Sequence, residues 1–75
     1  MDVYVVEISL EHSNGSIWVV FEDMEEAKQK VREKAELRAW EEESEVVVER
    51  DEKKYIIPIE GDDEQHIDIY DYTLR

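Results

Sequence analysis

The sequence predicts an α+β domain in which a single helix packs on an antiparallel sheet, with the elements in the order ββαβββ. Runs of β-branched and aromatic residues, bounded by turn residues, occur twice before and three times after one segment with helical periodicity. The chain has 75 residues and no cysteine. This is the size of one small domain without disulfides, so we expect residues 1–75 to form a single domain.

The two apolar runs before the helix, residues 3–10 and 16–21, are expected to form a hairpin. The Asn-Gly pair that ends at Gly15 is typical of a two-residue β-turn. A turn of this length places Ile8 opposite Phe21 and gathers apolar residues on one face.

A helix is predicted to begin near Met24 and to end around "WEEES". Asp23 is suited to the N-cap position, and Glu26 three residues later resembles a capping box. A narrow stripe of mostly small residues can lie close against a sheet. Its members are Met24, Ala27, Val31 and Ala35, whereas Leu37 and Trp40 lie off the stripe.

Residues 45–49 and 54–59 are predicted to form a second hairpin, in which Glu49 faces Lys54. Pro58 lacks an N–H group, so we expect its strand to lie at an edge or to end there.

The phase of the fifth predicted strand is ambiguous. Ile67 and Ile69 share one face, whereas Tyr70 and Tyr72 share the other. We expect either a bulge near Ile69 or a strand that is covered on both faces.

One helix leaves the second face of the sheet uncovered. Exposed apolar patches with polar rims mark interaction sites. Three readings stay open: the sheet closes on itself, two copies pair through this face, or a foreign partner covers it. The residues expected there are Val3, Val5, Trp18, Val20, Val47 and Ile56, with Tyr70 and Tyr72 if the last strand keeps its phase.

The charge favours a basic partner. Twenty-two Asp and Glu oppose nine Lys and Arg, for a net charge of -13. Such a charge opposes direct binding to nucleic acid and to anionic membranes. No apolar run could span a bilayer, and no basic segment precedes the first apolar run. We therefore expect a soluble, cytoplasmic protein.

No pattern indicates catalysis or a cofactor. The chain lacks a glycine-rich phosphate loop, and its serines have no recognisable base arrangement. We therefore expect no enzymatic activity. The segment "GDDEQHID" combines carboxylates with His66, but its spacing fits no calcium loop, so a solvated turn is favoured over a metal site. Whether the acidic loop 60–66 binds a cation stays open.

The opening "VYVVEIS" and the segment "GSIWVVFEDMEEAKQKV" resemble those of small uncharacterised phage and prokaryotic proteins. The resemblance covers about half of the chain and implies a ββα opening without a known activity. Size and charge are also similar to those of small acidic phage proteins that inhibit host defence, which would act in the host cytoplasm. The matching residues are Tyr4, Val5, Phe21, Glu25, Glu26 and Ala27.

These observations predict a small acidic interaction module, a phage-type inhibitor that binds the basic surface of a host nucleic-acid-binding protein or nuclease. Carboxylates in line along a strand can imitate phosphates. The alternative is a homodimeric structural or regulatory domain, and the helix-forming segment "EEAKQKVREKAE" is also typical of designed proteins. The expected partner-binding residues are Trp18, Glu45, Glu49, Asp51, Glu52, Asp62, Asp63, Glu64, Asp68, Tyr70, Asp71 and Tyr72.

Overall fold

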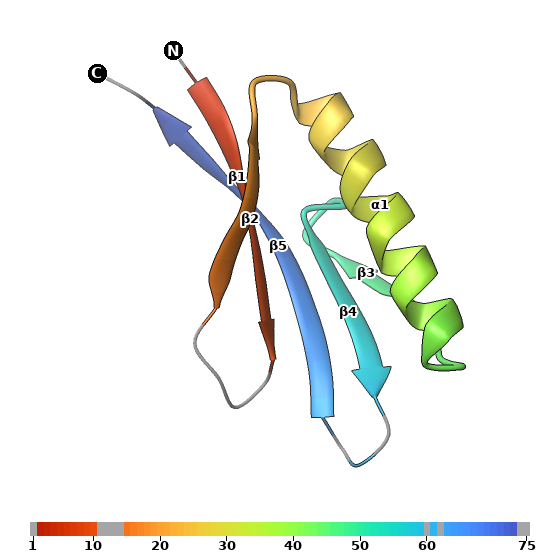
Figure 1. Ribbon diagram of the computed structural model, residues 1–75. Helices are drawn as coiled ribbons and strands as arrows, with labels where there is room; N and C mark the ends of the chain where they lie inside the picture. Colours follow the sequence, from red (N-terminus) through yellow and green to blue (C-terminus); the bar gives the residue numbers. More distant parts are fainter. Residues whose placement is uncertain (1, 11–14, 60, 62, 74–75) are drawn as a thin grey trace.

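The computed structural model describes residues 2–10, 15–59, 61 and 63–73. Five strands form one antiparallel sheet in the order β2-β1-β5-β4-β3, and the helix runs along one face of it (Figure 1). This confirms the predicted α+β fold and the ββαβββ order. The elements are β1 (Asp2–Leu10), β2 (Ser16–Phe21), α1 (Met24–Glu41), β3 (Val47–Glu49), β4 (Lys54–Ile59) and β5 (Asp63–Thr73).

The two ends of the chain meet in the middle of the sheet. β1 pairs with β5 without interruption, from Asp2 opposite Thr73 to Leu10 opposite Gln65. The regular ladder resolves the phase of β5. Ile67 and Ile69 are fully buried under α1, whereas the Tyr70 side chain points to the other face of the sheet. The pairing of β5 contains no bulge.

The predicted register of the first hairpin is wrong. Ile8 lies opposite Ser16, and Phe21 lies opposite Tyr4. The ladder shifts after Val6, where a β-bulge gives β2 one extra residue. The turn that was expected at Asn14-Gly15 falls partly on residues 11–14, which lie outside the described residues.

Gly15 lies close to a side chain of the neighbouring strand. A Cβ atom at this position would collide with the side chain of Glu7 on the neighbouring strand. Gly15 is not among the described residues with positive φ, so the left-handed conformation that motivated the turn prediction is not its role.

The second hairpin has the predicted register, with Val48 opposite Tyr55 and Glu49 opposite Lys54. β3 is shorter than predicted and begins at Val47. Of the two alternatives predicted from Pro58, the strand end is the one observed: β4 lies between β5 and β3 but ends at Ile59, one residue after Pro58. Pro58 is tolerated beyond the segment that pairs with β3, where β4 has a strand on one side only.

Both ends of α1 are capped by the chain itself. The Asp23 carboxylate accepts a hydrogen bond from the Glu25 N–H at 3.1 Å, which confirms the predicted N-cap. At the other end, the Ser44 N–H donates to the Ala39 carbonyl at 2.8 Å, and the Glu43 N–H donates to the Trp40 carbonyl at 3.2 Å. Glu43 has a φ of 53°, so the helix ends in a Schellman motif with a left-handed residue that is not glycine.

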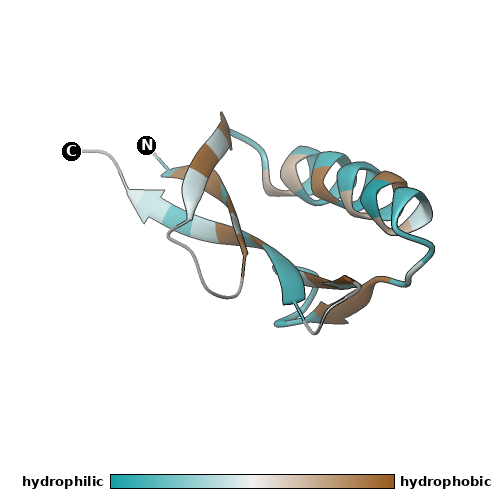
Figure 2. Cartoon of the chain, turned by 60° about the horizontal axis from the view of Figure 1, so that its bottom comes forward, coloured by the Kyte–Doolittle hydropathy of each residue, from teal (hydrophilic) through white to brown (hydrophobic). Residues whose placement is uncertain are grey.

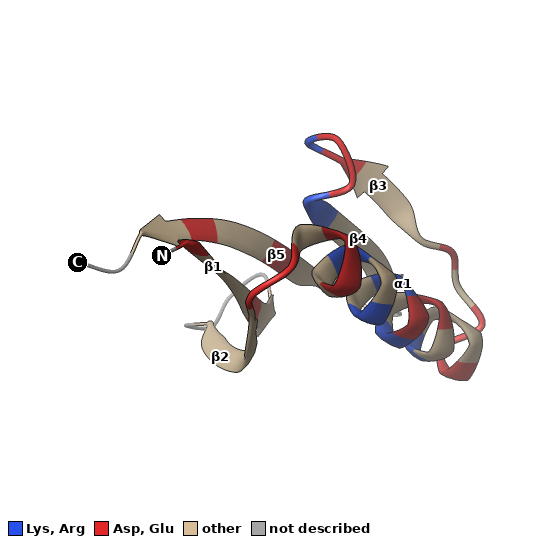
Figure 3. Cartoon of the chain, turned by 90° about the horizontal axis from the view of Figure 1, so that it is seen from above, with Lys and Arg blue, Asp and Glu red and all other residues tan. Residues whose placement is uncertain are grey.

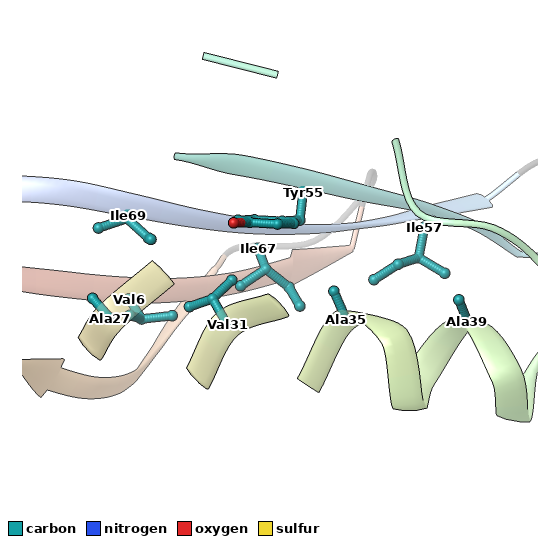
Figure 4. Close-up of a cluster of buried hydrophobic side chains, with 9 residues drawn as sticks. All are labelled: Val6, Ala27, Val31, Ala35, Ala39, Tyr55, Ile57, Ile67 and Ile69. Atoms are coloured by element: carbon teal, nitrogen blue, oxygen red, sulfur yellow. The ribbon is translucent and has the colours of Figure 1, made fainter. Parts of the chain in front are cut away.

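The core lies between α1 and the centre of the sheet (Figure 4). The helix contributes a stripe of small side chains, which extends the predicted stripe by one turn to Ala39. The strands contribute larger ones, and each fully buried Val or Ile side chain stabilises the fold by roughly 1.5–3 kcal/mol. The buried cluster consists of Val6, Ala27, Val31, Ala35, Ala39, Tyr55, Ile57, Ile67 and Ile69.

Tyr55 is the one polar side chain of this cluster. It is fully buried, and its hydroxyl makes no well-formed hydrogen bond in the described part of the chain, although the Arg32 side chain is close enough to interact with it. Burial raises the pKa of this hydroxyl above its ordinary value of 10.0, and the positive charge of Arg32 opposes the shift. The folded state therefore holds the phenolic proton more tightly than the unfolded state does.

We predict that Tyr55→Phe leaves stability at pH 7 unchanged or raises it by about 1 kcal/mol, because the ring stays and an unpaired buried hydroxyl is lost. Wild-type stability should fall as the pH rises past 10.0, and the variant should lose less stability over that range. Urea unfolding at pH 7 and at a pH above 10.0 measures the free energy of unfolding of both proteins. A variant clearly less stable at pH 7 would show that the hydroxyl has a partner.

Candidate protein-interaction surface

The face of the sheet opposite α1 contains an apolar groove of about 350 Å³. Because Val6 and Ile69 face the helix, their neighbours along β1 and β5 face the other way. The groove spans three adjacent strands, β2, β1 and β5. Its lining residues are Val3, Val5, Ile17, Val20 and Tyr72.

The groove is open to solvent along its margins. The exposed fraction is 66% for Ile17, 61% for Tyr72 and 49% for Val20, whereas Val3 is buried at 8%. Figure 2 shows hydrophobic stretches in the strands as well as along the helix. The expectation that apolar residues remain exposed behind the sheet is therefore met at this end of it.

The bulge exchanges the expected positions of Ile17 and Trp18. Ile17 was not among the residues expected on the uncovered face, but it lies opposite Glu7 and lines the groove. Trp18 was expected behind the sheet, but its ring lies against the helix, with the Lys34 Nζ 4.6 Å from the ring centroid. The extra residue in β2 breaks the alternation on which the prediction relied.

The centre of the open face carries a buried charge, which corrects the expectation of an apolar centre. Asp68 is 4% exposed, and its Oδ1 lies 3.5 Å from the Arg50 Nη1 and 3.6 Å from the Lys54 Nζ. The two cations satisfy a carboxylate that would otherwise be costly to bury. Asp68 is therefore a structural residue, and it is not available to a partner.

Tyr70 lies between this ion cluster and the groove. The Arg50 guanidinium is 5.6 Å from the centroid of its ring. Burial, together with the negative charges of Asp68 and Glu7, raises the pKa of the Tyr70 hydroxyl, and Arg50 opposes the shift. Tyr70 therefore stays neutral and can present an aromatic edge to a partner.

The predicted acidic row on β3 is interrupted. Glu45 precedes the strand, whereas Glu49 ends it opposite Lys54. Asp51 and Glu52 lie in the following turn, and Glu52 pairs with Arg32 at 2.9 Å. These carboxylates therefore do not form a row on one face of a strand.

The remaining predicted acids lie on β5. Asp63 begins the strand, and the Glu64 carboxylate lies 3.0 Å from the His66 Nε2. Asp71 lies near the other end of β5, whereas Asp62 falls outside the described residues. The described residues contain no group of three side chains arranged to hold a metal ion. The predicted acids thus occupy separate places and form no single site.

Most of the Lys and Arg side chains form ion pairs within the molecule. Of the nine Lys and Arg residues, five form ion pairs with carboxylates in the described part of the chain. Acidic positions remain at both ends of α1 and in the loops of the sheet (Figure 3). The five paired cations are Lys30, Arg32, Arg38, Arg50 and Lys54.

Two exposed apolar residues on the helix were left out of the predicted site. Trp40 is 78% exposed and Leu37 is 57% exposed. Their signal in the sequence is their position off the apolar stripe of the helix. Ile17 gave no comparable signal, because nothing in its neighbourhood marks the bulge.

No protein-family model, curated protein or solved structure matches the sequence. Within the described ranges, α1 is not long and apolar enough to cross a membrane. The chemistry of the surface is therefore what bears on function.

We predict that Asp68→Asn lowers the free energy of unfolding by about 1–3 kcal/mol, because charged hydrogen-bond partners contribute on this scale. Arg50 and Lys54 would lose their shared carboxylate. Asp71→Asn is the matched control, since Asp71 is exposed on the same strand. Equal unfolding midpoints in urea for the two variants would contradict a structural role for Asp68.

Proposed function

We propose that this protein is a small acidic interaction module that binds a basic surface of a nucleic-acid-binding protein and competes with nucleic acid there. The observation that carries the proposal is the surplus of surface carboxylates over cations. The net charge is -13, and most cations already have partners within the chain.

The carboxylates are concentrated where α1 ends. Glu41, Glu42, Glu43 and Glu45 follow one another at the end of the helix, and Arg38 pairs with Glu41 and Glu42 at 3.7 and 3.1 Å. Exposed ion pairs of this kind contribute little, so the local potential stays negative. A negative potential speeds association with a basic surface and opposes binding to like-charged molecules.

Competition with nucleic acid follows from the same charge. A surface that binds phosphates presents Lys and Arg side chains, and carboxylates can occupy these in place of phosphate oxygens. An inhibitor of a nuclease of the kind found in phages would act in this way, in the cytoplasm where such targets operate.

The test uses the immobilised protein and the heparin-binding fraction of a bacterial lysate, which is rich in basic proteins. Retained proteins should elute as NaCl rises from about 0.05 to 0.5 M, since the distance over which charges attract each other shortens over this range. Duplex DNA or RNA should displace them at low salt. Retention that neither salt nor nucleic acid changes would contradict the proposal.

Matched variants separate charge from shape. Replacing Glu41, Glu43 and Glu45 together with Gln removes three charges and should shift elution to lower salt. Replacing the same three residues with Asp keeps the charges and should leave elution close to that of the wild type.

A second candidate function, a homodimeric structural or regulatory domain, is favoured by the apolar groove. Val5, Val20 and Tyr72 present apolar surface that a second copy could cover around a two-fold axis. The strongly acidic chains repel one another at long range, so screening by salt should favour this dimer.

We predict for this candidate that the molar mass in solution doubles as salt is added and that Ile17→Glu restores the monomer. The new charge would be buried in the groove of the dimer interface. Light scattering at low and high salt measures the mass. Trp18→Glu is the control, because the Trp18 side chain lies on the opposite face of the sheet. If both variants disrupt the dimer equally, its interface is not this groove.

A further inference from the structure

Leu37 and Trp40 form an apolar patch on the outer side of α1, and we name it the Trp40 patch. They are three positions apart in the helix and are therefore neighbours on its surface. The neighbouring Ala35 and Ala39 are buried against the sheet, so the patch points away from it. An exposed tryptophan is costly in water and is typical of the anchor of a protein interface.

Carboxylates surround the Trp40 patch. Glu33 and Glu41 lie four positions before and after Leu37, and Glu36 lies four positions before Trp40. Glu43 follows the end of the helix. Glu33 and Glu41 form long, exposed ion pairs at 3.8 and 3.7 Å. No ion pair of Glu36 or Glu43 is present among the described residues, so the rim of the patch is negative.

The stability of the fold does not explain this placement. The C-terminal end of a helix carries a partial negative charge, which cations stabilise and carboxylates destabilise. Here Arg38 is the basic residue of the last turn, whereas Glu41, Glu42 and Glu43 crowd the same end. Glu43 also adopts a left-handed conformation that glycine would adopt with less strain.

We infer that the Trp40 patch is the docking anchor for a cationic amphipathic segment of the partner. Lysine or arginine side chains of that segment would meet Glu33, Glu36 and Glu41, and its apolar side chains would cover Leu37 and the Trp40 ring. This inference rests on the proposed function, because it assigns the partner of the acidic surface to one face of α1.

The charge around the two apolar surfaces favours α1 over the groove for such a partner. Arg50 lies over Tyr70, next to the groove on the open face of the sheet. Glu7 lies opposite Ile17 on the same face, so the charge beside the groove is mixed and attracts a cationic segment less than a mainly acidic rim does. At the Trp40 patch, three of the four flanking side chains at helical spacing are acidic, and the fourth, Lys34, has its Nζ over the Trp18 ring.

The test uses a synthetic 14-residue amphipathic peptide of lysine and leucine as the probe, labelled for fluorescence anisotropy. Trp40→Ala and Leu37→Ala should each raise its Kd by about tenfold, as interface anchors do. Ile17→Ala, which removes apolar surface from the groove, is the matched control and should leave the Kd unchanged. All four proteins should give the same circular dichroism spectrum, since the substituted side chains are exposed.

A second readout places the peptide directly. In a Trp18→Phe background, Trp40 is the remaining tryptophan, and its emission should shift to shorter wavelength when the peptide binds. Two outcomes would overturn the inference. In the first, Trp40→Ala leaves the Kd of the peptide unchanged and the Trp40 emission does not shift; in the second, only Ile17→Ala weakens binding. In both cases a Kd that rises with salt leaves the proposed function standing. A Kd independent of salt would overturn the proposed function itself.

Discussion

The fold depends on the close approach of α1 to the middle of the sheet, which its stripe of small residues allows. Ala27, Ala35 and Ala39 bring the helix axis near enough for Val31 to reach the strands. A helix with side chains is about 10–12 Å wide, whereas five strands at about 4.8 Å spacing span roughly 19 Å. One helix therefore covers about half of one face, and the uncovered surface follows from this ratio.

The uncovered surface lies where this geometry requires it. Val48 on the outer strand β3 belongs to the same face as buried Tyr55, yet it is 48% exposed because it lies beyond the width of the helix. The opposite face has no helix in the described part of the chain, and it keeps the groove around Val20 open. Burial in this domain is concentrated on β4 and β5, at the expense of both margins.

Local chemistry determined what the sequence could predict. The helix start was predicted from Asp23 and the residues next to it, and the register of the second hairpin from Glu49 and Lys54, which do lie opposite each other. The bulge in β2 was not predicted, because the uninterrupted apolar run of β2 carries no residue that marks it. The central pairing of β1 with β5 joins residues more than fifty positions apart, and no local pattern specifies it.

The candidate surface was predicted in kind but not in membership. An excess of apolar strand residues over the area of one helix was enough to predict exposed apolar surface. Which residues form it depends on single registers, and one extra residue exchanged Ile17 for Trp18. Asp68 reads as one more surface acid in the sequence, and only the meeting of Arg50 and Lys54 shows that it is buried.

Neither edge strand of the sheet is well suited to pairing with a strand of another molecule. β3 has three residues and ends in Glu49, and a short charged strand is a poor template for another strand. β2 contains no charge, but its bulge distorts the ladder and Trp18 is drawn toward Lys34 on the helix. Because both edges resist strand addition, the groove behind the sheet and the outer side of α1 remain as exposed apolar surfaces of the described chain. These two surfaces differ in their surrounding charge, which is why the proposed cationic partner is assigned to the outer side of α1.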